Sequence, residues 1–157
     1  MIRRCTLVSV GKPKGWAAEA SKDYADRLRR YFPVDILEVS EVDMNRRSHN
    51  EVLSSEGESI LRRLPKEAYV ISLDREKGKQ HPSERLALEL ENLGAKGHSR
   101  VAFVIGGPLG LSPDVLRRSN ALWSFGPITL PHALARIVLL EQLYRAVKIL
   151  RNEKYHW

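Results

Sequence analysis

Three features near the carboxyl end of the sequence combine residue types that suit a binding or catalytic site. Residues 106–110 read Gly-Gly-Pro-Leu-Gly, a turn in which the glycines let the backbone approach a ligand closely. His132 follows Pro131 at an expected helix start, where its ring can reach a neighbouring pocket. The last three residues, 155–157, are Tyr, His and Trp, and aromatic rings beside a basic group can stack on a nucleobase and orient it.

A carboxylate in the last helical stretch also needs a chemical explanation. Glu141 belongs to the apolar run 133–144, where an unpaired carboxylate is costly. Arg145 follows one helical turn later and is the nearest candidate for an ion pair. The sequence leaves two interpretations open, a structural ion pair and a catalytic role.

Other kinds of site find little support in the sequence. The glycine turn lacks the Lys-Ser/Thr pair of a phosphate-binding loop, and its spacing does not match the dinucleotide fingerprint. The five histidines are scattered without the spacing of metal ligands, so no metal is expected. The single cysteine, Cys5, lies in a first apolar stretch with no histidine nearby, which argues against a disulfide and against a covalent cysteine mechanism.

Length, composition and charge limit the class of protein. The 157 residues, 43% of them hydrophobic, fit one domain over residues 1–157 that buries its core without metals or disulfides. Without a transmembrane-length apolar run or a leader pattern, we expect a soluble, cytoplasmic protein. The formal net charge of +7 predicts a polyanionic partner, with nucleic acid as the leading candidate, because basic side chains release condensed counterions from phosphates.

Apolar strands and amphipathic helices alternate along the chain. Strands are expected at 4–10, 35–39, 68–74, 101–105 and 123–130, and helices at 16–31, 52–64, 83–93, 113–118 and from 133 onward. Pro33, Pro65 and Gly94 are expected to end the first three helices. The alternation predicts a parallel α/β sheet with helices on both faces, in which ligands bind beyond the carboxyl ends of the strands.

The helix that begins near residue 133 is apolar on nearly every side in its first half. A peripheral helix of a monomer would instead show a polar face. We therefore expect this helix to be sandwiched between layers of the fold or between two subunits, and a homodimer is the economical explanation.

Taken together, these motifs resemble the SPOUT class of methyltransferases, and within it the small bacterial family that methylates N3 of a pseudouridine in 23S ribosomal RNA. The resemblance covers essentially the whole chain and is strongest in residues 103–112, 129–132, 141–146 and 155–156. It implies a parallel-sheet α/β fold with a C-terminal trefoil knot, which no general folding rule would predict. It also implies a homodimer that acts on ribosomal RNA. Because one small domain without an appended RNA-binding domain must read its target through shape and charge, we expect the assembled ribosome to be the substrate.

The same resemblance implies S-adenosylmethionine as the cofactor, held in the knot largely by the backbone of three loops. By motif match these loops contain Leu73, Gly107 and the run Gly126, Pro127, Ile128, Thr129, Leu130 and Pro131. This cofactor has no phosphate, which agrees with the missing phosphate-binding loop. The chain departs from the family pattern at Gly126 and Pro127, in a variable part of the third loop, and at Trp157, where relatives usually end in a basic residue.

Catalytic roles follow from the resemblance and from residue type. His132 is expected to act as the base or to orient it, because the imide nitrogen of the pseudouridine must lose its proton. Tyr155 and His156 are expected to hold the pseudouridine, from the same or from the partner subunit. Arg145 is expected to neutralise charge that develops on the base oxygens, with Glu141 orienting it.

Two alternatives remain at this point. A non-catalytic, basic RNA-binding or ribosome-associated protein would need the positive charge but no cofactor pocket. A related methyltransferase acting on transfer RNA would share the cofactor loops and differ in the tail.

Overall fold

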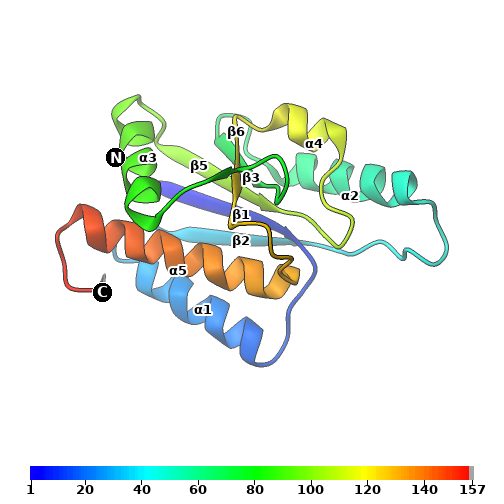
Figure 1. Ribbon diagram of the computed structural model, residues 1–157, viewed down its shortest axis with the longest axis horizontal. Helices are drawn as coiled ribbons and strands as arrows, with labels where there is room; N and C mark the ends of the chain where they lie inside the picture. The colour runs from blue at the N-terminus through cyan, green and yellow to red at the C-terminus, as the bar shows by residue number, and fades with distance from the viewer. Residues whose placement is uncertain (156–157) are drawn as a thin grey trace.

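The computed structural model describes residues 1–155, in which six strands form one sheet. The strands are β1 (Arg4–Val10), β2 (Val34–Val39), β3 (Tyr69–Leu73), β4 (Lys79–Gln80), β5 (Arg100–Ile105) and β6 (Ala121–Ser124). Their order across the sheet is β2-β1-β5-β3-β6-β4, and all neighbouring strands pair in parallel (Figure 1). The predicted parallel α/β sheet is confirmed.

Helices cover both faces of this sheet. One face packs against α1 (Trp16–Leu28), α3 (Ser83–Ala95) and α5 (His132–Leu150), and the other against α2 (His49–Arg63) and α4 (Pro113–Arg118). Helix α5 lies between α1 and α3, so the fold of one subunit buries much of its apolar surface (Figure 1). Leu134 and Leu150 remain exposed on this helix.

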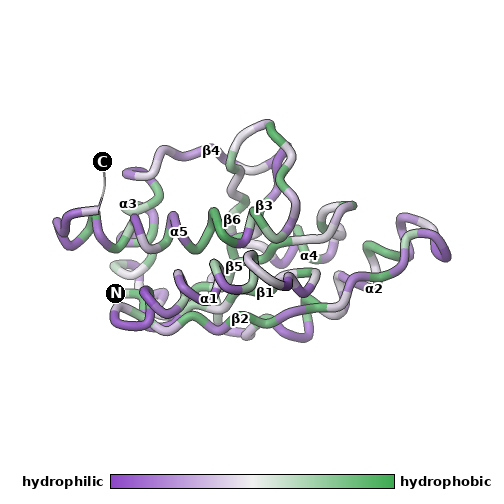
Figure 2. The backbone as a smooth tube through the Cα atoms, turned by 90° about the horizontal axis from the view of Figure 1, so that it is seen from below, coloured by the Kyte–Doolittle hydropathy of each residue, from purple (hydrophilic) through white to green (hydrophobic). Residues whose placement is uncertain are grey.

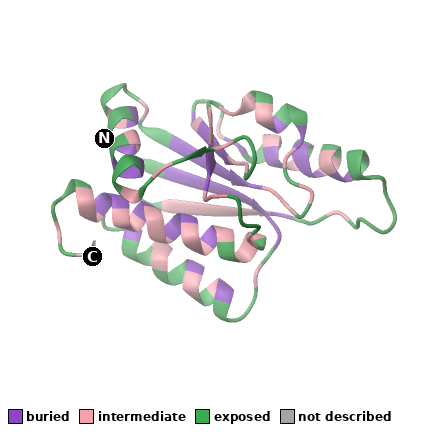
Figure 3. Ribbon diagram, in the orientation of Figure 1, coloured by how far each residue is buried: buried purple, intermediate pink, exposed green. Residues whose placement is uncertain are grey.

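Side chains alternate between the two faces along the central strands. In β5, Val101, Phe103 and Ile105 face the layer of α1, α3 and α5, whereas Ala102 and Val104 face α2 and α4. Strands covered on both faces read as continuous apolar runs, which explains the sequence of β5. Figure 3 shows the central strands largely buried, and Figure 2 shows hydrophobic residues around β3 and β6 but hydrophilic ones at the outer end of α2.

The ends of the first two helices differ from the expected ones for local reasons. Helix α1 stops at Leu28, whose carbonyl oxygen accepts the N–H of Tyr31 in a turn. Helix α2 begins earlier than expected, inside the polar segment, because the Ser48 side chain accepts the N–H of Glu51 at 3.2 Å. This is a helix N-cap, which satisfies a backbone donor that would otherwise lack a partner.

Helix α3 runs through Gly94 to Ala95 instead of ending at the glycine. A Cβ added at Gly94 would lie 2.8 Å from the backbone nitrogen of Met1. Gly94 therefore permits the start of the chain to pass against the helix, and Gly94 does not end the helix.

Candidate functional site

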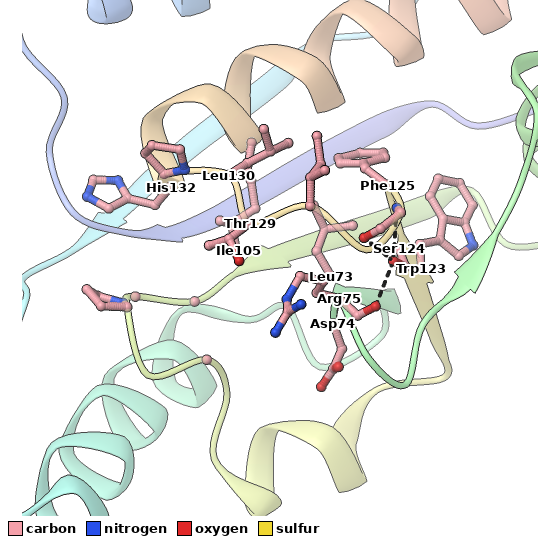
Figure 4. Close-up of a pocket in the computed structure, with 18 of the residues that line it drawn as sticks. Leu73, Asp74, Arg75, Ile105, Trp123, Ser124, Phe125, Thr129, Leu130 and His132 are labelled. Carbon is pink, nitrogen blue, oxygen red and sulfur yellow. Dashed lines mark hydrogen bonds between the residues drawn. The ribbon is translucent and has the colours of Figure 1, made fainter.

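A cavity of about 620 Å³ opens at the carboxyl ends of β5, β3 and β6 (Figure 4). These strands are neighbours in the sheet, so the loops that follow them lie side by side. The lining residues are 73–75, 105–108, 110, 123–126 and 128–132, together with Glu41 and Ala135. Parts of the chain that are distant in sequence therefore form one site.

All the residues expected to bind the cofactor line this cavity except Pro127. The carbonyl oxygen of Pro127 instead accepts a hydrogen bond from Nη1 of Arg75 at 3.0 Å. Pro127 thus connects the third loop of the cavity to the first.

The third loop begins earlier than the sequence suggested, because β6 ends at Ser124 and does not continue to residue 130. The Ser124 hydroxyl accepts the N–H of Gly126 at 3.1 Å and donates to the carbonyl oxygen of Arg75 at 3.0 Å (Figure 4). Gly126 has a φ of +106°, which L side chains rarely adopt. This turn frees residues 128–131 to line the cavity.

The first loop folds back across β6. An Asp74 carboxylate oxygen accepts the N–H groups of Glu76 and Lys77 at 3.0 and 2.9 Å, which closes a turn directly after β3. A Cβ added at Gly78 would lie 2.3 Å from the carbonyl carbon and oxygen of Trp123. The loop therefore touches the backbone of β6, and the short strand β4, which the sequence did not predict, then pairs with β6.

The glycine turn forms the second loop. Gly107 and Gly110 pair as an isolated antiparallel bridge, and a Cβ added at Gly106 would lie 2.5 Å from the carbonyl oxygen of Gly110. Helix α4 follows immediately, and the Ser112 side chain accepts the N–H of Val115 as its N-cap. The glycines are thus needed to close the turn tightly at the strand end.

A carboxylate that the sequence did not single out lies behind this turn. Glu56 of α2 is 3% exposed; its Oε2 accepts the N–H of Val42 at 3.0 Å, while Oε1 has no partner among residues 1–155. A Cβ added at Gly107 would lie 3.1 Å from Oε1. Burial raises the pKa of Glu56. In the sequence, Glu56 stands among serines and glutamates, so its pattern suggests an exposed helix face.

His132, in the first turn of α5, is one of the residues that line the cavity (Figure 4). Its Nε2 is 3.2 Å from Oε1 of Glu41, and its Nδ1 is buried without a partner in the described part of the chain. The ring rests on Gly11, where an added Cβ would lie 2.3 Å from Cε1 of the imidazole. Neither Glu41 nor Gly11 carried a signal in the sequence, because only the tertiary fold brings them to α5.

The other expected catalytic residues form a separate cluster that does not line the cavity. Glu141 accepts hydrogen bonds from Arg145 at 2.6 and 3.0 Å and from the hydroxyl of Tyr155 at 3.1 Å, which confirms the expected ion pair. The hydrogen bond to Glu141 raises the pKa of Arg145, and burial raises the pKa of Tyr155. His156 lies outside the described residues.

The charges around the cavity suit a ligand with a cationic centre better than a polyphosphate. Asp74 and Glu41 are among its lining residues, and Arg75 is the only lysine or arginine among those that are described. The Arg75 guanidinium already contacts Glu76 and the carbonyl oxygen of Pro127. Much of the remaining wall is apolar side chain or glycine backbone, as ligand pockets generally are.

Among residues 1–155, no group of three or more His, Cys, Asp and Glu side chains is placed to hold a metal ion. None of the described helices combines the length and apolar character needed to cross a membrane. Cys5 is buried, and burial raises the pKa of its thiol, which opposes formation of a nucleophilic thiolate.

The chain belongs to the SPOUT methyltransferase family. The family described as "Predicted SPOUT methyltransferase" matches residues 3–156, nearly the whole sequence. The chain is 62% identical over 158 residues to "Ribosomal RNA large subunit methyltransferase H" of Rubrobacter xylanophilus, with all of both chains covered. It is 44% identical to the protein of the same name from Listeria monocytogenes, over 96% of this chain and 97% of that relative.

Solved structures support the fold assignment. A probable methyltransferase from Bordetella pertussis superposes with a TM-score of 0.54 at 17% identity, covering 92% of this chain and 96% of that chain. A probable methylase family protein from Haemophilus influenzae gives a TM-score of 0.53 at 15% identity, over 97% of this chain and 69% of that chain. These similarities show a shared architecture.

Proposed function

We propose that this chain methylates N3 of a pseudouridine in 23S ribosomal RNA, with S-adenosylmethionine as methyl donor. It would act as a cytoplasmic, single-domain homodimer on the assembled ribosome. One observation carries the proposal: in a SPOUT chain, three loops at adjacent strand ends converge on one cavity of about 620 Å³. The full-length relatives named as large-subunit ribosomal RNA methyltransferases support the choice of substrate.

The residues around the cavity fit S-adenosylmethionine. Apolar side chains such as Leu73 and Leu130 would hold the adenosine, and glycine backbone at Gly107 would allow it to approach closely. The Asp74 and Glu41 carboxylates favour a cation in the cavity. When bound, the cofactor supplies an electrophilic methyl group on a sulfonium.

The first loop supports the proposed knot. Residues 74–80 pass over β6, with Gly78 against the backbone of Trp123 and the hydroxyl of Ser124 bonded to the carbonyl of Arg75. The chain then continues from β6 into α5. A tight crossing of this kind is what threading of the C-terminal segment requires.

The separation of the expected catalytic residues supports a homodimer. His132 lies at the cavity, whereas Glu141 lies nine residues further along α5, or about 13 Å at 1.5 Å per residue. Tyr155 lies against Glu141 and not against the cavity wall. A second copy related by a two-fold axis would bring its Tyr155 and His156 to the cavity of the first, giving two composite sites.

In such a site each side chain has a distinct task. His132 would accept the imide proton, or orient the group that accepts it, at the cavity. Arg145, held by Glu141, would stabilise negative charge on the base oxygens. Tyr155 would orient the base, and burial keeps its hydroxyl protonated and able to donate a hydrogen bond, because its pKa is raised.

Calorimetry with S-adenosylmethionine tests the cofactor assignment, with ATP as the control ligand. We expect one S-adenosylmethionine bound per chain and no binding of ATP, because the cavity offers carboxylates and no free cluster of basic groups. Binding of ATP without S-adenosylmethionine, or of neither ligand, would exclude the proposed enzyme and favour a non-catalytic RNA-binding protein.

A further inference from the structure

The buried arginine of α5 has no role in the site described so far. Arg136 is 3% exposed, although arginine is almost never fully buried unless it is paired. Its Nη1 donates to Oε2 of Glu38 at 3.1 Å, and its Nη2 donates to the carbonyl oxygen of Gly11 at 3.2 Å. Both acceptors lie at the carboxyl ends of β1 and β2, the end of the sheet that carries the cavity.

Arg136 acts on the same piece of backbone as His132. The two residues are one helical turn apart, so their side chains lie on one face of α5. His132 packs on Gly11, and Arg136 bonds to the carbonyl oxygen of that glycine. Glu41, which contacts His132, follows shortly after Glu38 in the chain. Arg136 thus bonds to the backbone on which the imidazole packs and to the strand that leads to Glu41.

Packing alone is a poor explanation for this ion pair. Apolar side chains of similar volume often replace a buried ion pair at no cost in stability. The Nε of Arg136 has no partner among residues 1–155, so the guanidinium is not even fully satisfied. An apolar pair would fill the space, but it would not hold the Gly11 carbonyl or the end of β2 in a fixed position.

We propose that Arg136 is a positioning residue, which holds Gly11 and Glu38 so that His132 presents its imidazole to the cavity in one orientation. The effect on methyl transfer rests on the function proposed above. The effect on the orientation of His132 does not, and it is measured separately.

The test compares Arg136→Met with a matched control, Arg4→Met. Arg4 pairs with Asp35 at 2.7 Å across the same two strands, at their amino ends and in exposed positions. Three quantities are measured: the Kd for S-adenosylmethionine, kcat for methyl transfer to large ribosomal subunits that lack the modification, and the NMR signals of ¹³C-labelled histidine. His132→Gln assigns the signal of His132.

In Arg136→Met we expect kcat to fall roughly 10- to 100-fold, as for a misplaced catalytic group, and Kd to change by less than about threefold. The His132 signal should shift, while those of the other histidines stay as in wild type. Gly11→Ala should shift the same signal, because its methyl group would overlap the imidazole. Arg4→Met should match wild type in all three measurements.

A double variant, Arg136→Met with Glu38→Leu, separates positioning from stability. Its apolar pair should restore the unfolding temperature toward that of wild type, while kcat stays low and the His132 signal stays shifted. Wild-type kcat and an unchanged His132 signal in this variant would overturn the proposal. If wild-type protein transfers no methyl group, the proposed function fails, and the His132 signal alone then decides for or against positioning.

Discussion

Two carboxylates near the site differ sharply in their surroundings. Glu141 accepts hydrogen bonds from Arg145 and Tyr155, whereas Glu56 is buried with one oxygen unpartnered among residues 1–155. Burial raises the pKa of Glu56 above its unfolded value, so the fold favours the protonated form. The stability that Glu56 contributes is therefore fully present below its pKa in the unfolded chain. This stability is lost as the pH rises through its pKa in the folded protein.

Replacement of Glu56 by glutamine should thus change the pH dependence of stability. The amide keeps the shape and can still accept the N–H of Val42, but it cannot ionise. We expect Glu56→Gln to be more stable than wild type at pH 8, with the difference shrinking toward pH 5, as measured by urea unfolding. Glu58→Gln, at an exposed position of the same helix, should follow wild type. An equal pH dependence in Glu56→Gln and wild type would contradict the assignment.

At the scale of single residues, the sequence pointed to side chains whose type is unusual at their position in the chain. It missed residues whose role depends on contacts with residues far away in the sequence. Leu73 ends a strand, His132 begins a helix, and the glycines follow directly after strands, which is a local pattern. Arg136 gains its role from Glu38, which is 98 positions away in the chain. No periodicity within one helix predicts such a contact.

The element that does most to shape the site is the loop that crosses β6. Its turn after Asp74, its hydrogen bonds to Ser124 and Pro127, and the pairing of β4 with β6 all hold it against one strand. The sequence predicted no strand between 68–74 and the helix at 83–93, because β4 is two residues long and is defined by its partner. The end of β6 was likewise set by a side-chain hydroxyl, which strand propensity does not detect.

Gly78→Ala should damage this crossing. The new methyl group would overlap the Trp123 carbonyl, and this backbone group cannot move aside. We therefore expect the free energy of unfolding to fall by an amount near the upper end of the roughly 1–3 kcal/mol typical of overpacking. Gly97→Ala is the control, because Gly97 has a φ of +93° but open space around it, and strain alone should cost about 1 kcal/mol. The free energy of unfolding of both variants is measured by urea unfolding. Equal losses in the two variants would argue against a tight crossing.

At the scale of the whole molecule, the central prediction is that two subunits build each site. His132→Ala should lower methyl transfer by roughly 10²- to 10⁴-fold, as expected for a group that moves a proton. Tyr155→Phe should lower it by roughly 10-fold or more, as expected for a group that orients the base. Mixed dimers of the two variants would contain one intact site if Tyr155 acts on the partner's cavity. An equal mixture should then recover about one quarter of wild-type activity. No recovery would place both residues in the same subunit's site.

The sequence was sufficient for the sheet, its covered faces and the edge that carries the cavity, because alternating strands and helices permit few arrangements. It was not sufficient for the surroundings of Glu141. His132 and Glu141 both lie on α5, but only the tertiary fold shows that Tyr155 packs on Glu141 and that this cluster does not line the cavity.

The most direct test of the account is to map the methyl group that this enzyme transfers. Purified protein, S-adenosylmethionine with a labelled methyl group and unmodified large ribosomal subunits are incubated, and the labelled nucleotide is identified by nuclease digestion and mass spectrometry. We predict label on N3 of a single pseudouridine of 23S ribosomal RNA, and roughly 10²- to 10⁴-fold slower labelling with His132→Ala. Label on transfer RNA, on another atom, or on no nucleotide at all would contradict the proposed function.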